Sequence, residues 1–273
     1  FVPMLIGFGC SVPGILAART VSSERDRKMT VLLVPFMSCS AKLPIYSLIT
    51  MACFPRYQAL VMLGVYVLSM VVGVLYGLLL KVTVFKGNPV PFVMELPNYR
   101  WPSLKTLLRN SWEKGKSFIR KAFTVIFVAT LVIWFLQSVD TSFNFTSDSS
   151  VSILAEIGRF LSPVFVPLGL GDWRLTTSII TGLTAKEAVV STLAVLFGVA
   201  SESLSAVLSA AFSPLQGFCF LAFVVLYMPC VAAVAAVRKE LGSGWKAVLA
   251  MFSQTVVAYL VTLIIYNVGT LFV

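Results

Sequence analysis

The chain has 273 residues, of which 58% are hydrophobic and 12% charged, and its mean hydropathy is +0.94. This composition excludes an ordinary soluble domain and predicts an all-α polytopic membrane protein in a lipid bilayer. The net charge of +10 does not indicate a nucleic-acid partner, because the basic residues fall in short stretches between apolar segments, as in cytoplasmic loops.

The first apolar segment, residues 2–20, contains helix breakers at its centre: Gly7, Gly9, Pro13 and Gly14. A central break leaves half-helices of about eight to ten residues, roughly 12–15 Å long, which reach the middle of a bilayer and no further. We therefore expect a re-entrant hairpin in which Ser11 caps the second half-helix, so that the helix dipole favours a thiolate at Cys10. The basic residues that follow predict that this hairpin enters from the cytoplasm: Arg19, Arg25, Arg27 and Lys28.

Two longer apolar segments follow, at residues 29–54 and 58–80, and each exceeds the roughly 20 residues that a crossing needs. In the first, Cys39 lies between Ser38 and Ser40, so we expect an interrupted span whose free carbonyl groups line a pathway. Lys42 is a charge within this apolar segment, and such a charge is costly unless it is paired or faces a cavity.

The middle of the chain is more polar. Prolines at 89, 91, 97 and 102 predict an irregular cytoplasmic linker. Residues 103–121 alternate apolar and basic side chains, which indicates either an amphipathic helix on the inner membrane surface or a solvated basic loop. Residues 118–137 then form a third crossing, and residues 138–150, with two Asp and no Lys or Arg, form an external loop.

The second half repeats the order of the first. Residues 173–197 break at Gly182 and are expected to form a hairpin that enters from outside. Residues 215–237 form an interrupted span, because Pro229 removes a backbone donor and frees a carbonyl group, and residues 245–272 form a plain span that ends outside. The segments 36–41 and 227–232 match in pattern. The sequence thus predicts about five full transmembrane helices and two broken hairpins, arranged as an inverted repeat, in three parts: 1–80, 81–150 and 151–273.

Three of the five cysteines lie beside these breaks, and we predict that they form a pathway for a soft metal ion: Cys10, Cys39 and Cys230. The chain has no histidine, so the secondary donors would be backbone carbonyls and the hydroxyls of Ser11 and Ser38. The alternative is that these cysteines only pack, because a free Cys behaves as a small hydrophobe. The spacing of the cysteines shows no disulfide framework.

Two consecutive charges lie at the tip of the second hairpin, Lys186 and Glu187. Consecutive residues do not face each other on a helix, so each is expected to have its own partner. Glu187 could accept hydrogen bonds, a proton or a cation. Lys186 could neutralise a cluster of carbonyl groups at the other hairpin as a fixed structural group, and a structural and a functional role remain open for both residues.

Several runs of residues closely resemble the membrane region of FeoB-type ferrous iron transporters. They are Gly7-Phe8-Gly9-Cys10-Ser11-Val12-Pro13-Gly14, Pro35-Phe36-Met37-Ser38-Cys39-Ser40-Ala41-Lys42, Thr181-Gly182-Leu183-Thr184-Ala185-Lys186-Glu187 and Pro229-Cys230-Val231-Ala232. The resemblance implies two gate-type halves, with Fe²⁺ moving inward across a bacterial plasma membrane along the motif cysteines. The family's usual Asn after the first motif cysteine is Ser11 here, which leaves a hydroxyl in place of an amide oxygen.

The resemblance also implies which partners act with this chain and which activities lie outside it. It implies a cytoplasmic GTP-binding domain N-terminal to this part of the same protein, and hence no enzyme in this chain, no permanently bound cofactor and GTP only in that other domain. Small accessory proteins of the iron system and a second copy of the chain are further partners that it allows.

Three functions remain open from the sequence. The first is transport of a soft metal ion. Because thiols suit Fe²⁺ but also Zn²⁺ and Cu⁺, the residues alone do not select the metal. A carrier for a nucleoside-like organic solute would use similar hairpins, with incidental thiols. A membrane scaffold that anchors a regulatory GTPase would depend on the basic segment 103–121 instead.

Overall fold

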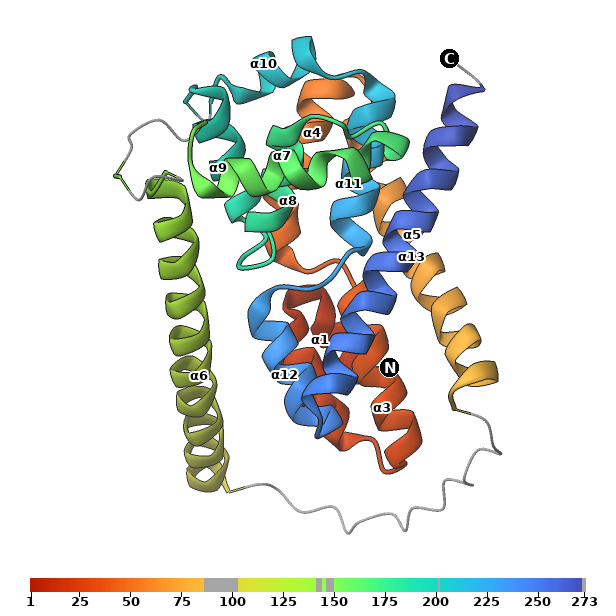
Figure 1. Ribbon diagram of the computed structural model, residues 1–273. Helices are drawn as coiled ribbons and strands as arrows, with labels where there is room; N and C mark the ends of the chain where they lie inside the picture. Colours follow the sequence, from red (N-terminus) through yellow and green to blue (C-terminus); the bar gives the residue numbers. More distant parts are fainter. Residues whose placement is uncertain (86–102, 141–143, 146–149, 201, 272–273) are drawn as a thin grey trace.

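The computed structural model describes residues 1–85, 103–140, 144–145, 150–200 and 202–271 (Figure 1). Every named secondary-structure element within them is a helix, and the described residues hold only two isolated β-bridges besides, which confirms the all-α prediction. Four helices or broken helices are long and apolar enough to cross a membrane, and a bent pair whose halves meet at 106° makes up to five. This count agrees with a polytopic protein of about five crossings, but the fifth candidate is the bent pair Ile153–Leu168 with Trp173–Thr181, whereas the crossing expected at 118–137 contains only a shorter apolar helix, Phe123–Ser138.

The first hairpin consists of α1 (Val2–Gly9) and α2 (Ser11–Ala17), which pack against each other and lead into a 3₁₀ turn, Ala18–Thr20. The break is at Cys10, whose backbone is extended, with φ −152° and ψ 133°. The expected cap was wrong: Cys10 takes the N-cap position and Ser11 is the first helical residue. The reason is that the chain turns one residue earlier than the position of Pro13 suggested.

The first interrupted span also breaks where the sequence predicted. Helix α3 (Glu24–Leu33) is followed by two 3₁₀ turns, η2 (Val34–Phe36) and η3 (Ser40–Lys42), and then by α4 (Leu43–Cys53). The plain span is α5 (Gln58–Thr83).

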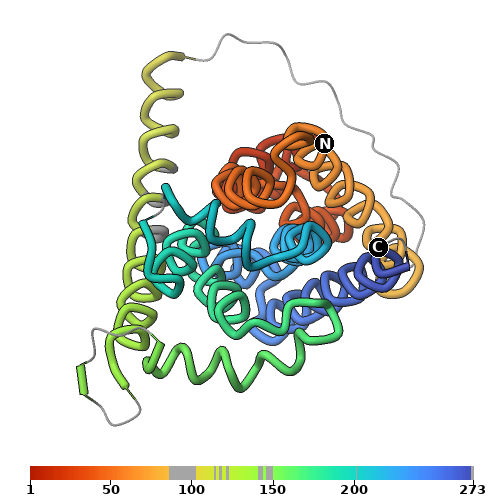
Figure 2. The backbone as a smooth tube through the Cα atoms, turned by 90° about the horizontal axis from the view of Figure 1, so that it is seen from above, coloured from red at the N-terminus to blue at the C-terminus, as the bar shows by residue number. Residues whose placement is uncertain are grey.

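The basic segment after residue 103 does not form a separate surface helix. It continues without a break into the apolar segment as α6 (Leu104–Ser138), a single helix of 35 residues, about 52 Å long at the helical rise. No proline interrupts these residues, so nothing in the backbone ends the helix between its basic and apolar parts. Helix α6 stands at the edge of the bundle in both views (Figures 1 and 2). The prolines at 89–102 lie outside the described residues.

The second half contains the expected hairpin, broken span and plain span, with two additional helices. The hairpin is α8 (Trp173–Thr181) and α9 (Ala188–Phe197), the broken span is α11 (Pro214–Leu226) and α12 (Val231–Leu241), and the plain span is α13 (Gly244–Thr270). Helices α7 (Ile153–Phe165) and α10 (Leu204–Ala211) were not predicted. Both lie at the upper end of the molecule (Figure 1).

The two halves interlock. In Figure 1 the first broken span runs from α3 in the lower part to α4 in the upper part, and the second runs in the opposite direction from α11 to α12. As a result α12 packs against α2 of the first hairpin, and α4 packs against α9 of the second. The first hairpin lies in the lower part and the second in the upper part (Figure 1). This is the arrangement that an inverted repeat requires.

The lower end carries an ion pair between the halves. Arg19, just after the first hairpin, donates two hydrogen bonds to one carboxylate oxygen of Glu240 in α12, from Nε over 2.9 Å and from Nη2 over 2.6 Å. The Glu240 side chain is 5% exposed, so its charge depends on this partner. The positive-inside rule predicts that this end faces the cytoplasm.

Candidate functional site

Four interruptions of the helices lie close together, linked by hydrogen bonds and electrostatic contacts. They lie at Cys10 and at residues 37–39, 182–187 and 227–230. A hydrogen bond joins each broken span to the hairpin of its own half. The Ser40 hydroxyl donates to the Gly9 carbonyl over 2.8 Å, and the Val231 backbone N–H donates to the Leu183 carbonyl over 2.8 Å.

The two bonds occupy corresponding places in the repeat, although one donor is a side-chain hydroxyl and the other a backbone N–H. In each case the donor residue directly follows a motif cysteine, and the acceptor lies at or next to the interruption of the hairpin. The first interruption contains Cys10, whereas the second, residues 182–187, contains no cysteine, so the two halves do not offer the same donor atoms.

The three motif cysteines lie in one region. Cys10 is exposed, whereas Cys39 and Cys230 are half-buried. Cys10 lies close enough to Cys39, Cys230 and Glu187 for their charges to interact. In the part of the chain that the structure describes, however, no three Cys, Asp or Glu side chains form a group that could hold a metal ion. The fold thus brings the thiols together without arranging them as a closed ligand set.

The two candidate serines differ in their surroundings. Ser11 is buried at the start of α2. Ser38 belongs to a buried chain of hydrogen bonds: the Tyr46 hydroxyl donates to Ser38 Oγ over 3.0 Å, Ser38 Oγ lies 3.2 Å from Ser69 Oγ, and Ser69 donates to the Tyr66 carbonyl. Because the single proton of Ser69 is used there, Ser38 must donate to Ser69. Its hydroxyl is thereby fixed in place beside Cys39.

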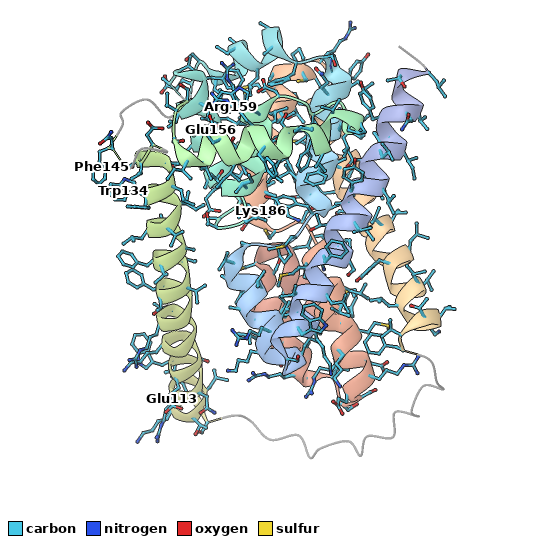
Figure 3. The ribbon with its side chains drawn as sticks, viewed as in Figure 1. Glu113, Trp134, Phe145, Glu156, Arg159 and Lys186 are labelled. Carbon is cyan, nitrogen blue, oxygen red and sulfur yellow. The ribbon has the colours of Figure 1, made fainter. Side chains whose placement is uncertain are left out.

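Lys186 is buried at the centre of the molecule (Figure 3). Its Nζ atom donates to the carbonyl oxygen of Met228 over 2.9 Å and lies 3.1 Å from the centroid of the Tyr227 ring. The Tyr227 hydroxyl donates in turn to the Ile179 carbonyl over 3.0 Å. The carbonyl acceptor of Lys186 therefore lies at the break in the second broken span and not at the first hairpin, where the sequence predicted it.

Lys42 is also buried and reaches the same broken span from the other half. Its Nζ atom donates to the carbonyl oxygen of Val225 over 2.7 Å. In a continuous helix that carbonyl would accept from the residue four positions later, which is Pro229 and has no N–H. Lys42 therefore satisfies the acceptor that Pro229 leaves free.

Glu187 differs from its neighbour because its side chain is exposed, directly before α9. Lys186 bonds to the Met228 carbonyl, and a separate partner for Glu187 stays a prediction. Glu187 lies within electrostatic range of Cys10, with a smaller effect there than Cys39 or Cys230.

Sequence reasoning missed the residues that support this region: Tyr46, Ser69 and Tyr227. A signal existed for Ser69, which is a polar residue inside the apolar segment 58–80 and is fully buried. No local signal distinguishes the two tyrosines from other aromatic residues of the spans, because Tyr227 contacts Ile179, 48 residues away, and Tyr46 reaches Ser38 only across the break before α4.

Comparison with known proteins gives two family matches. Residues 62–114 match the family described as "Ferrous iron transport protein B C terminus", and residues 119–244 match the Gate family, described as "Nucleoside recognition". No solved structure matches the chain significantly.

Relatives match over the whole chain. The "Fe(2+) transporter FeoB" of Staphylococcus aureus (strain COL) is 43% identical over all of this chain and 41% of its own length. The protein of the same name from Methanocaldococcus jannaschii is 39% identical over 99% of this chain and 41% of its own. A "Fe(2+) transport protein A/Fe(2+) transporter FeoB fusion protein" of Porphyromonas gingivalis is 36% identical over 100% of this chain and 38% of its own. The chain spans about two fifths of the length of these relatives.

Proposed function

Because this chain belongs to the FeoB family, whose C-terminal part it matches, we propose that it forms the membrane pathway for ferrous iron uptake across the plasma membrane. The observation that carries the proposal is the convergence of three cysteines from three separate helix breaks around Cys10. Breaks of this kind are where transporters bind their substrates, because the backbone is free of helical hydrogen bonds there.

The donors suit the proposed substrate. Thiol sulfur binds Fe²⁺ but also Zn²⁺ and Cu⁺, so discrimination would rest on geometry and on the oxygen donors. The exposed carboxylate of Glu187 and the hydroxyl of Ser11 are the oxygen donors that we propose beside the thiols. Ser38 is better suited to holding Cys39 in position, because its proton and one lone pair are already engaged.

The proposal covers only the membrane part of the transporter. We assign no enzymatic step and no permanently bound cofactor to this chain. We infer that a GTP-binding domain of the same protein and accessory proteins of the iron system act with it. The relative whose printed name joins transport protein A to FeoB supports such an accessory partner. A second copy of the chain is a further candidate partner.

The proposal is tested by Fe²⁺ uptake in cells that produce the full-length protein with Cys10→Ser, Cys39→Ser or Cys230→Ser at matched expression. We expect each substitution to lower the initial rate about tenfold or more, since a weaker ligand replaces a thiol in the pathway. Cys53→Ser is the matched control, because Cys53 is also half-buried but lies at the end of α4, away from the breaks.

Unchanged uptake in all three variants would exclude the thiol pathway. Fe²⁺ uptake no greater with the wild-type protein than in cells that lack it would instead favour a carrier for an organic solute or a membrane scaffold, since in either case the thiols only pack.

A further inference from the structure

In the described part of the chain, two buried lysine side chains lie at the centre of the protein and form no ion pair with an acidic residue. Lys42 is 3% exposed and Lys186 2% exposed, and no ion pair in the described part of the chain includes either of them. Both donate instead to backbone carbonyls of one broken span, at Val225 and Met228. Charges at this depth are costly, so their presence calls for a physical reason.

Satisfying a free carbonyl does not require a charge. In the first broken span the carbonyl oxygen of Leu32 accepts from Nε2 of Gln254 over 3.1 Å, and Gln254 is a buried residue of the opposite half. Lys42 makes the reciprocal contact, from the first half to the second. Since a neutral amide suffices in one direction, the fold needs a donor at Val225 but not a positive charge.

The position of the charges gives a second argument. Lys42 and Lys186 are close enough to repel each other, which adds to the cost of their burial in a medium of low dielectric. Both also lie within electrostatic range of Cys39 and Cys230. Any divalent cation at the thiols would therefore meet two positive charges.

We propose that the carbonyl oxygens of Val225 and Met228, together with Cys230, form a binding site for a divalent metal cation, and that the tethered ammonium groups of Lys42 and Lys186 fill it in this conformation. Unwound segments of transporter helices coordinate cations through such carbonyls. The lysines and the metal ion compete for the same oxygen atoms. The pathway is thus closed to divalent cations until the lysines withdraw.

This inference rests on the proposed function and has its own test. The full-length protein is reconstituted in liposomes that contain a fluorescent dye quenched by Mn²⁺, a cation that accepts carbonyl oxygen ligands readily. Without nucleotide, we expect wild-type vesicles to exclude Mn²⁺. We expect Lys42→Gln and Lys186→Gln to raise the initial influx at least tenfold, because each keeps a hydrogen-bond donor and removes the charge.

Two controls separate charge from other effects. Lys42→Arg keeps the positive charge and should leave the vesicles closed. Lys81→Gln removes a charge in the last turn of α5, where the side chain is exposed, and should also leave them closed. Influx in either control equal to that of the Gln variants would overturn the proposal.

A binding measurement covers the case in which a variant does not survive reconstitution. Titration of the detergent-solubilised variants with Mn²⁺, followed by electron paramagnetic resonance, should give a Kd at least tenfold lower than that of the wild type. The lysine proposal would be refuted if vesicles with the Gln variants admit Mn²⁺ no faster than wild-type vesicles. It would also be refuted if the Gln variants bind Mn²⁺ no more tightly than the wild type. Failure of the proposed function is distinguishable, because it would appear as Fe²⁺ uptake unaffected by the cysteine substitutions.

Discussion

At the scale of single residues, the first hairpin depends on glycine where its two helices touch. A Cβ atom at Gly14 would lie 2.9 Å from the Pro3 carbonyl oxygen and 3.0 Å from the Cα atom of Gly7, both of them backbone atoms that cannot give way. We expect Gly14→Ala to cost about 1–3 kcal/mol by overpacking and to lower the thermal unfolding midpoint of the purified protein. Gly64→Ala is the matched control, since nothing lies within 4 Å of its Cβ position and the helix gains up to about 1 kcal/mol. Equal midpoints for the two variants would contradict the close contact.

At the scale of elements, the break between α11 and α12 depends on a proline. Pro229→Ala supplies an N–H that can bond to Val225 in place of Lys42, and Ala is favoured over Pro within a helix by about 3 kcal/mol. We expect the span to become continuous, so that Fe²⁺ uptake falls at least about tenfold while the unfolding midpoint holds or rises. Pro214→Ala serves as the control, because Pro214 is the first residue of α11, where an N–H needs no helical partner. Wild-type uptake in the Pro229 variant would show that the break is dispensable.

At the scale of the whole molecule, the inverted repeat fixes the side of the membrane that each hairpin faces. The turn before α10 and the turn before α3 lie at opposite ends (Figure 1), and Ser203 and Ser22 in these turns are both exposed. In a background without native cysteines, we expect an impermeant maleimide to label Ser203→Cys from outside intact cells and Ser22→Cys only after the membrane is opened. Labelling of both from the same side would rule out the inverted arrangement.

The positions of the breaks and the crossings followed from the sequence because their causes are local. Glycine and proline interrupt a helix wherever they lie, which located the turn near Cys10 and the interruption at Pro229. The same local reasoning failed for the separate surface helix, since neither a glycine at 115 nor a change in polarity ends α6. The division into parts 1–80, 81–150 and 151–273 stays a prediction.

The sequence by itself determined that this protein is a helical membrane protein with two broken halves, and its motifs determined the family, because hydrophobic length and helix breakers act within a single segment. Only the tertiary structure decided what the buried polar groups do. Lys42 meets Val225 at a separation of 183 residues, and Tyr46 and Ser69 meet at Ser38 from neighbouring elements. The Lys42 contact arises from the packing of the two halves against each other, and the Ser38 contacts arise from the packing of α4 and α5 within the first half, so no single segment encodes them.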